Sequence, residues 1–216
     1  MRAGEQMVQQ YRTVEKRGQT EIEEKKSRFI ADVKPATNEQ QALAFIDEIK
    51  TKYPDASHHV FAYVMESSRI QRYNDDGEPS GTAGIPVLEV IKKEQVQDVV
   101  VVVTRYFGGT LLGAGGLVRA YAKSAKQGLD AANIVMMTLC EVIKLQVSYP
   151  LWGKVENEIM GMGYEVETVQ YHEAVSATIR VETTKVEIFI KKMVSITNNR
   201  VTINKQGSRY CIKCTE

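Results

Sequence analysis

Residues 96–121 read VQDVVVVVTRYFGGTLLGAGGLVRAY, and this stretch decides the fold of the first half of the chain. The unbroken valines of residues 99–103 predict a strand buried on both faces, because a half-buried strand would alternate apolar and polar residues. The glycines between residues 108 and 116 predict sharp turns that lead into a helix. A buried strand, a glycine-rich turn and a helix are therefore expected in succession.

The preceding residues predict further strands and two helices around that buried strand. Alternation predicts strands over residues 11–16, 19–25, 27–33, 58–66 and 69–75, the last two joined in a hairpin at Ser67 and Ser68. Residues 38–53 read as an amphipathic helix capped by Asn38. Residues 79–95 begin as a turn and become a helix, with Ser80 or Thr82 as the expected cap.

From residue 139 the pattern becomes strand, helix, strand, strand, helix, strand. This is the βαββαβ order of a ferredoxin-like domain, in which two helices cover one face of an antiparallel sheet. We therefore predict an α+β protein with one domain over residues 1–138 and a ferredoxin-like domain over residues 139–216. The topology alone predicts no function, because such domains serve many.

Composition indicates an ordinary globular protein. The 216 residues are 43% hydrophobic and carry a formal net charge of +1, so any nucleic-acid or anionic partner must be recognised by a local patch. No apolar run is long enough to cross a membrane, and the first residues lack the apolar segment of a secretory signal. We expect a cytoplasmic protein with no membrane partner and no cofactor.

The glycine-rich stretch does not match a known nucleotide-binding motif. A P-loop needs Lys followed by Ser or Thr after its second glycine, and a dinucleotide fingerprint starting at Gly113 would need a small residue where Val118 stands. Two interpretations stay open. Gly113, Gly115 and Gly116 at a helix N-terminus would favour an anion, with Arg105 and Arg119 nearby. Alternatively, the glycines only satisfy backbone geometry.

The helix after the glycines has two faces. One stripe is expected to be buried, and it comprises Val118, Tyr121, Ala122, Ala125, Leu129 and Ala132. The other stripe carries Arg119, Lys123 and Lys126 and is expected to be exposed. A basic stripe is often only a solvated face, but its position beside the glycines makes it a candidate phosphate-binding surface.

A second loop, DDGEPSGTAGIP at residues 75–86, gathers the carboxylates of Asp75, Asp76 and Glu78 with the hydroxyls of Ser80 and Thr82. Turn formation and capping account for most of these residues but not for Glu78. YNDDGEPSGTAGIPVLEVI followed by VVVVVTRYFGGTLLGAGGLVRAYAK resembles the signature pair of the YigZ/Impact family in its bacterial two-domain form. The resemblance covers the whole chain.

The resemblance implies a fold and a field of activity. The first domain would be similar to the second domain of a small-subunit ribosomal protein and to domain IV of elongation factor G. The second domain would be similar to domain V of that factor. Eukaryotic relatives regulate translation by competing for a kinase activator, but they carry an N-terminal partner-binding domain that does not align with this chain. The family offers no established catalytic residues to transfer.

Three functional hypotheses follow. The first is a non-enzymatic, translation-associated protein that binds RNA or the ribosome in a cleft between the two loops. Its contact residues would be Arg105, Tyr106, Gly113, Gly115, Gly116, Arg119, Tyr121, Lys123 and Lys126. The alternative is a phosphate-handling enzyme in which Asp75, Asp76 and Glu78 act beside the glycine turn, Asp76 and Glu78 being the candidate catalytic residues. The third is a regulatory protein partner bound by the same loops.

Other candidate sites are weaker. His58 and His59 are adjacent at a strand start, so their side chains point to opposite faces and do not jointly suit one metal, although one of them could reach the loops. Cys211 and Cys214 form half of a zinc motif without a second cysteine pair, and Cys140 lies far away in the sequence. No metal site is therefore predicted.

Overall fold

The computed structural model describes residues 8–65 and 70–213. These residues form two compact units. The first spans Tyr11–Met136, and the second comprises residues 8–10 and the described residues from 137 onward. The chain passes between the units within two strands, β1 (Gln10–Val14) and β7 (Ile134–Val147). The expected hairpin turn at Ser67 and Ser68 lies outside the described residues.

The first unit, which we call the N-terminal unit, is built on an antiparallel sheet with the order β2-β3-β6-β4-β5. Its strands are β2 (Gly18–Glu24), β3 (Ser27–Pro35), β4 (His58–Met65), β5 (Ile70–Asn74) and β6 (Val99–Tyr106). The valine run forms β6 at the centre of this sheet, as expected for a strand without a polar face.

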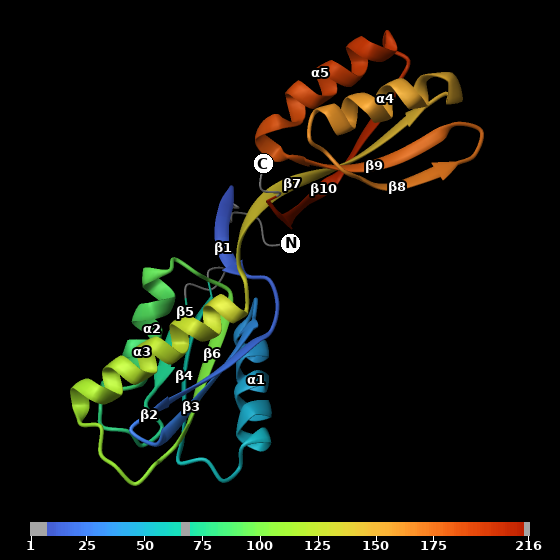
Figure 1. Cartoon of the computed structure of the whole chain (residues 1–216). Coiled ribbons are helices and arrows are strands. Elements are labelled where there is room, and N and C mark those ends of the chain that lie inside the picture. Colours follow the sequence, from blue (N-terminus) through green and yellow to red (C-terminus); the bar gives the residue numbers. More distant parts are fainter. Residues whose placement is uncertain (1–7, 66–69, 214–216) are drawn as a thin grey trace. The chain divides into compact units, whose positions relative to one another are not determined.

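Helices cover both faces of this sheet (Figure 1). They are α1 (Glu39–Lys52), α2 (Gly84–Lys93) and α3 (Ala114–Ala131). Val100 and Val102 pack with α1 on one face, while Val99, Val101 and Val103 pack with α2 and α3 on the other. Burial on both faces removes the whole valine run from water, which accounts for its uninterrupted apolar sequence.

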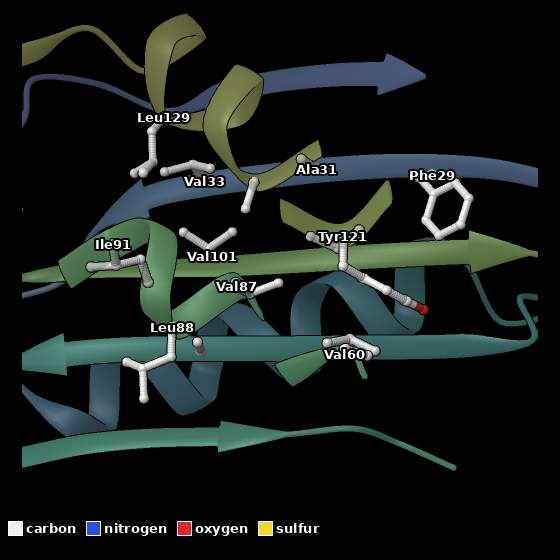
Figure 2. Close-up of a cluster of buried hydrophobic side chains, with 14 of the residues drawn as sticks. Phe29, Ala31, Val33, Val60, Val87, Leu88, Ile91, Val101, Tyr121 and Leu129 are labelled. Carbon is white, nitrogen blue, oxygen red and sulfur yellow. The ribbon is translucent and has the colours of Figure 1, made fainter. Parts of the chain in front are cut away.

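Figure 2 shows the core beneath α2 and α3, where Tyr121 and Phe29 lie near one another. Their ring centroids are 5.1 Å apart in an edge-to-face arrangement. The predicted buried stripe of α3 was wrong at Val118, which is 39% exposed, because Leu117 occupies the core side instead. Gly128 lets α3 approach β3 closely, since a Cβ there would lie 2.9 Å from the Cβ of Ala31.

The second unit, which we call the C-terminal unit, has the predicted ferredoxin-like order. Beyond β7 its elements are α4 (Tyr149–Gly161), β8 (Val166–Tyr171), β9 (Val175–Glu182), a 3₁₀ turn (Thr183–Lys185), α5 (Val186–Thr197) and β10 (Thr202–Ile212). The strands pair in the order β10-β7-β9-β8, all antiparallel. Apolar residues of β7 and β9 pack with Trp152, Phe189 and Met193 in a separate core. The α+β class is confirmed.

Candidate functional site

The loop between β5 and α2 is organised by Asp75. Its carboxylate accepts hydrogen bonds from the backbone amides of Gly81, Ala83 and Gly84, at 2.8, 3.2 and 2.7 Å. Asp75 therefore satisfies the free amides at the start of α2. The expectation that Ser80 or Thr82 caps this helix was wrong, since the Thr82 hydroxyl donates instead to the Pro79 carbonyl at 2.7 Å.

Asp76 fastens the same loop to the start of β4. The backbone amide of His59 donates to its Oδ2 at 2.6 Å, and the ring Nδ1 of His58 lies 2.7 Å from its carbonyl oxygen. The ring of His59 has Nε2 2.9 Å from the carbonyl oxygen of Tyr53 and Nδ1 3.9 Å from Asp76 Oδ2. Both histidines therefore approach the loop.

Glu78 is the buried centre of this region. Its Oε1 accepts from Arg105 Nη1 at 2.6 Å and from the Tyr121 hydroxyl at 2.7 Å, and it lies 3.9 Å from His58 Nε2. Burial raises the pKa of Tyr121, and the adjacent Glu78 carboxylate raises it further. One carboxylate thus joins the loop to β6 and α3, which explains why a glutamate stands in an otherwise ordinary turn.

Arg105 and Tyr121 are structural residues rather than surface contacts. Arg105 is 5% exposed, its Nη2 donates to Ser27 Oγ at 3.3 Å, and its guanidinium lies 5.4 Å from the Phe29 ring and 5.6 Å from the Phe107 ring. Tyr121 is fully buried. Their expected contacts with RNA phosphate and bases are therefore corrected: burial leaves neither side chain accessible.

The glycine turn combines positions that the backbone requires with one that it does not. The Gly108 amide donates to Ser27 Oγ at 3.1 Å, and a Cβ at Gly108 would lie 2.0 Å from the carbonyl carbon of Lys26. Gly113, just before α3, has a φ of +74°. At Gly115, by contrast, a Cβ would meet only the mobile end of Arg119, 3.7 Å away. Backbone geometry therefore accounts for Gly108 and Gly113 but not for Gly115.

A hollow of about 220 Å³ lies beside this turn, between the β2–β3 connection and α3, and we call it the basic hollow. Its lining residues are Glu24, Lys25, Leu112, Gly116, Arg119, Ala120 and Lys123. All three of its cations are exposed and, among the described residues, lack an ion-pair partner. The hollow therefore concentrates positive charge that no ion pair within the described part of the chain offsets.

The other predicted contact residues lie elsewhere or are engaged. The Lys126 ammonium pairs with Asp130 at 2.5 Å and with Glu94 at 3.6 Å, so its charge is offset. The Tyr106 hydroxyl donates to Asp55 at 3.1 Å. Sequence reasoning missed Lys25, which stands in the tight β2–β3 connection with a φ of +48°. A pair of adjacent lysines in a hairpin turn was the available signal.

The chain matches two known domain families. Residues 25–129 match the Impact N-terminal domain, and residues 145–200 match a domain of unknown function, DUF1949. The IMPACT family member YvyE of Bacillus subtilis is 41% identical over 208 residues, which cover 96% of each chain. The chain belongs to the IMPACT family. The IMPACT family member YigZ of Escherichia coli is 36% identical, covering 68% of this chain and 77% of its own.

A crystal structure of a hypothetical protein is similar over 91% of this chain and 97% of its own, with a TM-score of 0.59 and 29% identity. Eukaryotic members of the IMPACT family match a smaller part. The Saccharomyces cerevisiae homologue is 36% identical over 98 residues, which cover 43% of this chain and 37% of its own.

The basic hollow and the Glu78 centre both fall inside the Impact N-terminal match, apart from Glu24 at its edge. The described residues contain no cluster of three or more His, Cys, Asp or Glu side chains suited to a metal ion. Nor does any helix among them combine the length and apolar character needed to cross a membrane.

Proposed function

We propose that this IMPACT family protein is a non-enzymatic, translation-associated protein that binds RNA through the basic hollow. The observation that carries the proposal is the meeting of Lys25, Arg119 and Lys123 on one concavity, where none of them has an ion-pair partner within residues 8–65 and 70–213. Two separate elements supply these cations, so the hollow is a feature of the tertiary structure rather than of one helix face.

Phosphate is the group that suits this charge pattern. Lys and Arg side chains supply most contacts to nucleic-acid backbones, and a concave site lined by one sign of charge strengthens their attraction for a polyanion. Glu24 is the single acid in the lining, which leaves a net positive hollow. Near-neutral charge over the whole chain confines the attraction to this patch.

The turn before α3, which supplies Leu112 to the hollow, also carries exposed apolar side chains of the kind that bases contact. Phe107 is 48% exposed and Leu111 is 81% exposed, and both belong to the turn that leads into α3. Unpaired bases stack on exposed aromatic rings, whereas duplex RNA buries its base faces. We therefore propose single-stranded or loop RNA, free or within the ribosome, as the target. In this proposal Phe107 is the aromatic side chain on which a base stacks.

The three carboxylates that the enzyme alternative requires are already engaged in contacts within the protein. Asp75 binds the amides of α2, Asp76 binds β4, and Glu78 binds Arg105 and Tyr121. Carboxylates that hold a metal and phosphate need free oxygens aimed at one point. These three are instead directed at separate internal partners.

Binding of labelled single-stranded RNA, measured by fluorescence anisotropy, tests the proposal. Phe107→Ala and Leu111→Ala should each weaken single-strand affinity, the former by about 1 to 3 kcal/mol if a base stacks there. Leu43→Ala is the control, because Leu43 is 47% exposed on α1, which covers the opposite sheet face. Equal affinity for duplex and single strand would contradict the proposed target. A captured protein partner without RNA binding would favour the regulatory alternative.

A further inference from the structure

The C-terminal unit contains a cavity of about 280 Å³ that the proposed function does not use. Residues of β7, β9 and β10 form one side of it, and the segment after α4 together with Lys185 forms the other. This volume lies just below the range of about 300 to 1,000 Å³ that is typical of small-molecule sites, so the cavity suits only a small ligand.

Two thiols give the cavity an apolar wall. Cys211 is opposite Thr138 and Arg209 is opposite Cys140 in the pairing of β10 with β7, so the two cysteines share a face of the sheet. Burial raises the pKa of Cys140 to about 12, and the neighbouring Cys211 raises it too. Cys140 is therefore a neutral thiol near pH 7. Met162 extends this apolar wall.

One buried polar group in the cavity wall has no hydrogen-bond partner in the part of the chain that the structure describes. Thr138 is 3% exposed, and its hydroxyl makes no hydrogen bond with any described residue. It lies on the same sheet face as the two thiols. Buried hydroxyls without a partner are uncommon in folded proteins, because the lost hydration costs free energy. The hydroxyl oxygen itself is enclosed, but Thr138 lines the cavity, so rotation about its Cα–Cβ bond would bring the hydroxyl to a polar atom bound there.

Among the described residues that line the cavity, basic side chains outnumber acidic ones. Its lining includes the cations Arg180, Lys185 and Lys213 and the acids Glu165 and Glu182. Lys185 pairs with Glu182 at 3.2 Å. Arg180 is instead held through Nε by Glu167 at 2.8 Å, and Glu167 does not line the cavity. That ion pair is made through Nε, and the Arg180 side chain also lies beside the Cys211 sulfur in the cavity lining.

We propose that this cavity binds a small organic acid, a monocarboxylate with a short apolar body. Its carboxylate would pair with the Nη groups of Arg180, and an oxygen would satisfy the Thr138 hydroxyl. Its apolar body would lie against Cys140, Cys211 and Met162. The site is independent of the basic hollow, because every residue in it belongs to the C-terminal unit.

The two thiols allow a direct test with iodoacetate and iodoacetamide, which have nearly the same size and differ in charge. The full chain with Cys214→Ser is alkylated by each reagent at mildly alkaline pH, and modification of Cys140 and Cys211 is followed by peptide mass spectrometry. The rate ratio of iodoacetate to iodoacetamide is compared with that for glutathione. A carboxylate held by Arg180 predicts a ratio about tenfold or more above that of glutathione, and saturation with iodoacetate.

Arg180→Gln should return the ratio to that of glutathione. Arg209→Gln is the matched control, because Arg209 also pairs with Glu167 but does not line the cavity, so this variant should keep the raised ratio. Thermal unfolding verifies that both variants are folded. The proposal would be overturned if the protein with Arg180 intact gave the same rate ratio as glutathione. It would also be overturned if Arg180→Gln left the rate ratio unchanged.

Discussion

At the scale of single residues, Glu78 explains most of the signature loop. One buried carboxylate accepts from Arg105 and Tyr121 and thereby joins a loop, a strand and a helix. Hydrogen bonds to charged groups in a dry environment are strong, and a missing partner leaves a costly buried charge. Glu78, which turn formation could not explain, is thus a structural residue.

Glu78→Gln should lower the free energy of unfolding by about 3 to 5 kcal/mol, because Arg105 would stay buried without a counter-charge. Glu21→Gln is the control. Glu21 pairs with exposed Arg28 at 2.8 Å, and its loss should cost less than about 1 kcal/mol. Urea unfolding of both variants measures the difference. Equal losses would mean that the Arg105 charge is not held by Glu78.

Cys140 predicts a pH dependence of stability. Its pKa is raised to about 12 in the folded state by burial, above the ordinary value of a thiol. The unfolded chain loses this proton first, so the contribution is fully present below the unfolded pKa and is lost as pH rises toward 12. The slope is at most about 1.4 kcal/mol per pH unit. Cys140→Ala should flatten the alkaline decline of stability in urea titrations. An unchanged decline would contradict the assignment.

At the scale of elements, the periodicity of apolar residues predicted helices and strands. It did not predict the individual contacts that side chains make between them. The valine run predicted β6, and Asn38 was correctly predicted to cap α1, where its side chain accepts from the Gln41 amide at 2.9 Å. The α3 stripe was misread by one position because Leu117 and Val118 are both apolar. Lys25 was missed because the adjacent lysines of the β2–β3 turn do not by themselves indicate that this turn lies beside α3.

The residue that caps α2 was also not predictable from the local sequence. Ser80 and Thr82 stand where a capping residue is expected, yet Asp75 reaches across the loop to do this. Asp75→Ala should lower the free energy of unfolding by about 0.5 to 2 kcal/mol or more, because three backbone amides lose the carboxylate that accepts their hydrogen bonds. Ser80→Ala should change stability by less than about 0.5 kcal/mol. Thermal unfolding of the two variants decides between the caps, and the reverse ranking would restore Ser80.

The glycines separate backbone need from ligand approach. Gly108→Ala should destabilise the protein by about 1 to 3 kcal/mol or more, because the new Cβ would clash with Lys26. Gly115→Ala should leave stability unchanged or raise it by up to about 1 kcal/mol, since alanine favours a helix. If RNA approaches the start of α3, Gly115→Ala should nevertheless weaken RNA binding. Intact binding would assign Gly115 no role in the interface.

At the scale of the whole molecule, the two units have separate cores. We propose that residues 139–216, the second domain predicted from the sequence, fold without the rest. The isolated fragment should unfold cooperatively in circular dichroism but be less stable than in the full chain, being small. It would also lose Gln9, whose carbonyl accepts from the Leu139 amide at 2.9 Å and whose side chain accepts from Thr183. A fragment without cooperative unfolding would make the two units one folding domain.

The central claim is that the basic hollow binds RNA phosphates, and a salt titration of RNA binding tests it most directly. Replacing Lys25, Arg119 and Lys123 with Gln removes three phosphate contacts. This should weaken single-stranded RNA binding across sequences and reduce the slope of log affinity against log salt by about two. Lys16→Gln, Lys50→Gln and Lys93→Gln together remove the same charge from other exposed positions of the N-terminal unit and should leave the slope nearly unchanged. Equal slopes for the two triple variants would contradict the account.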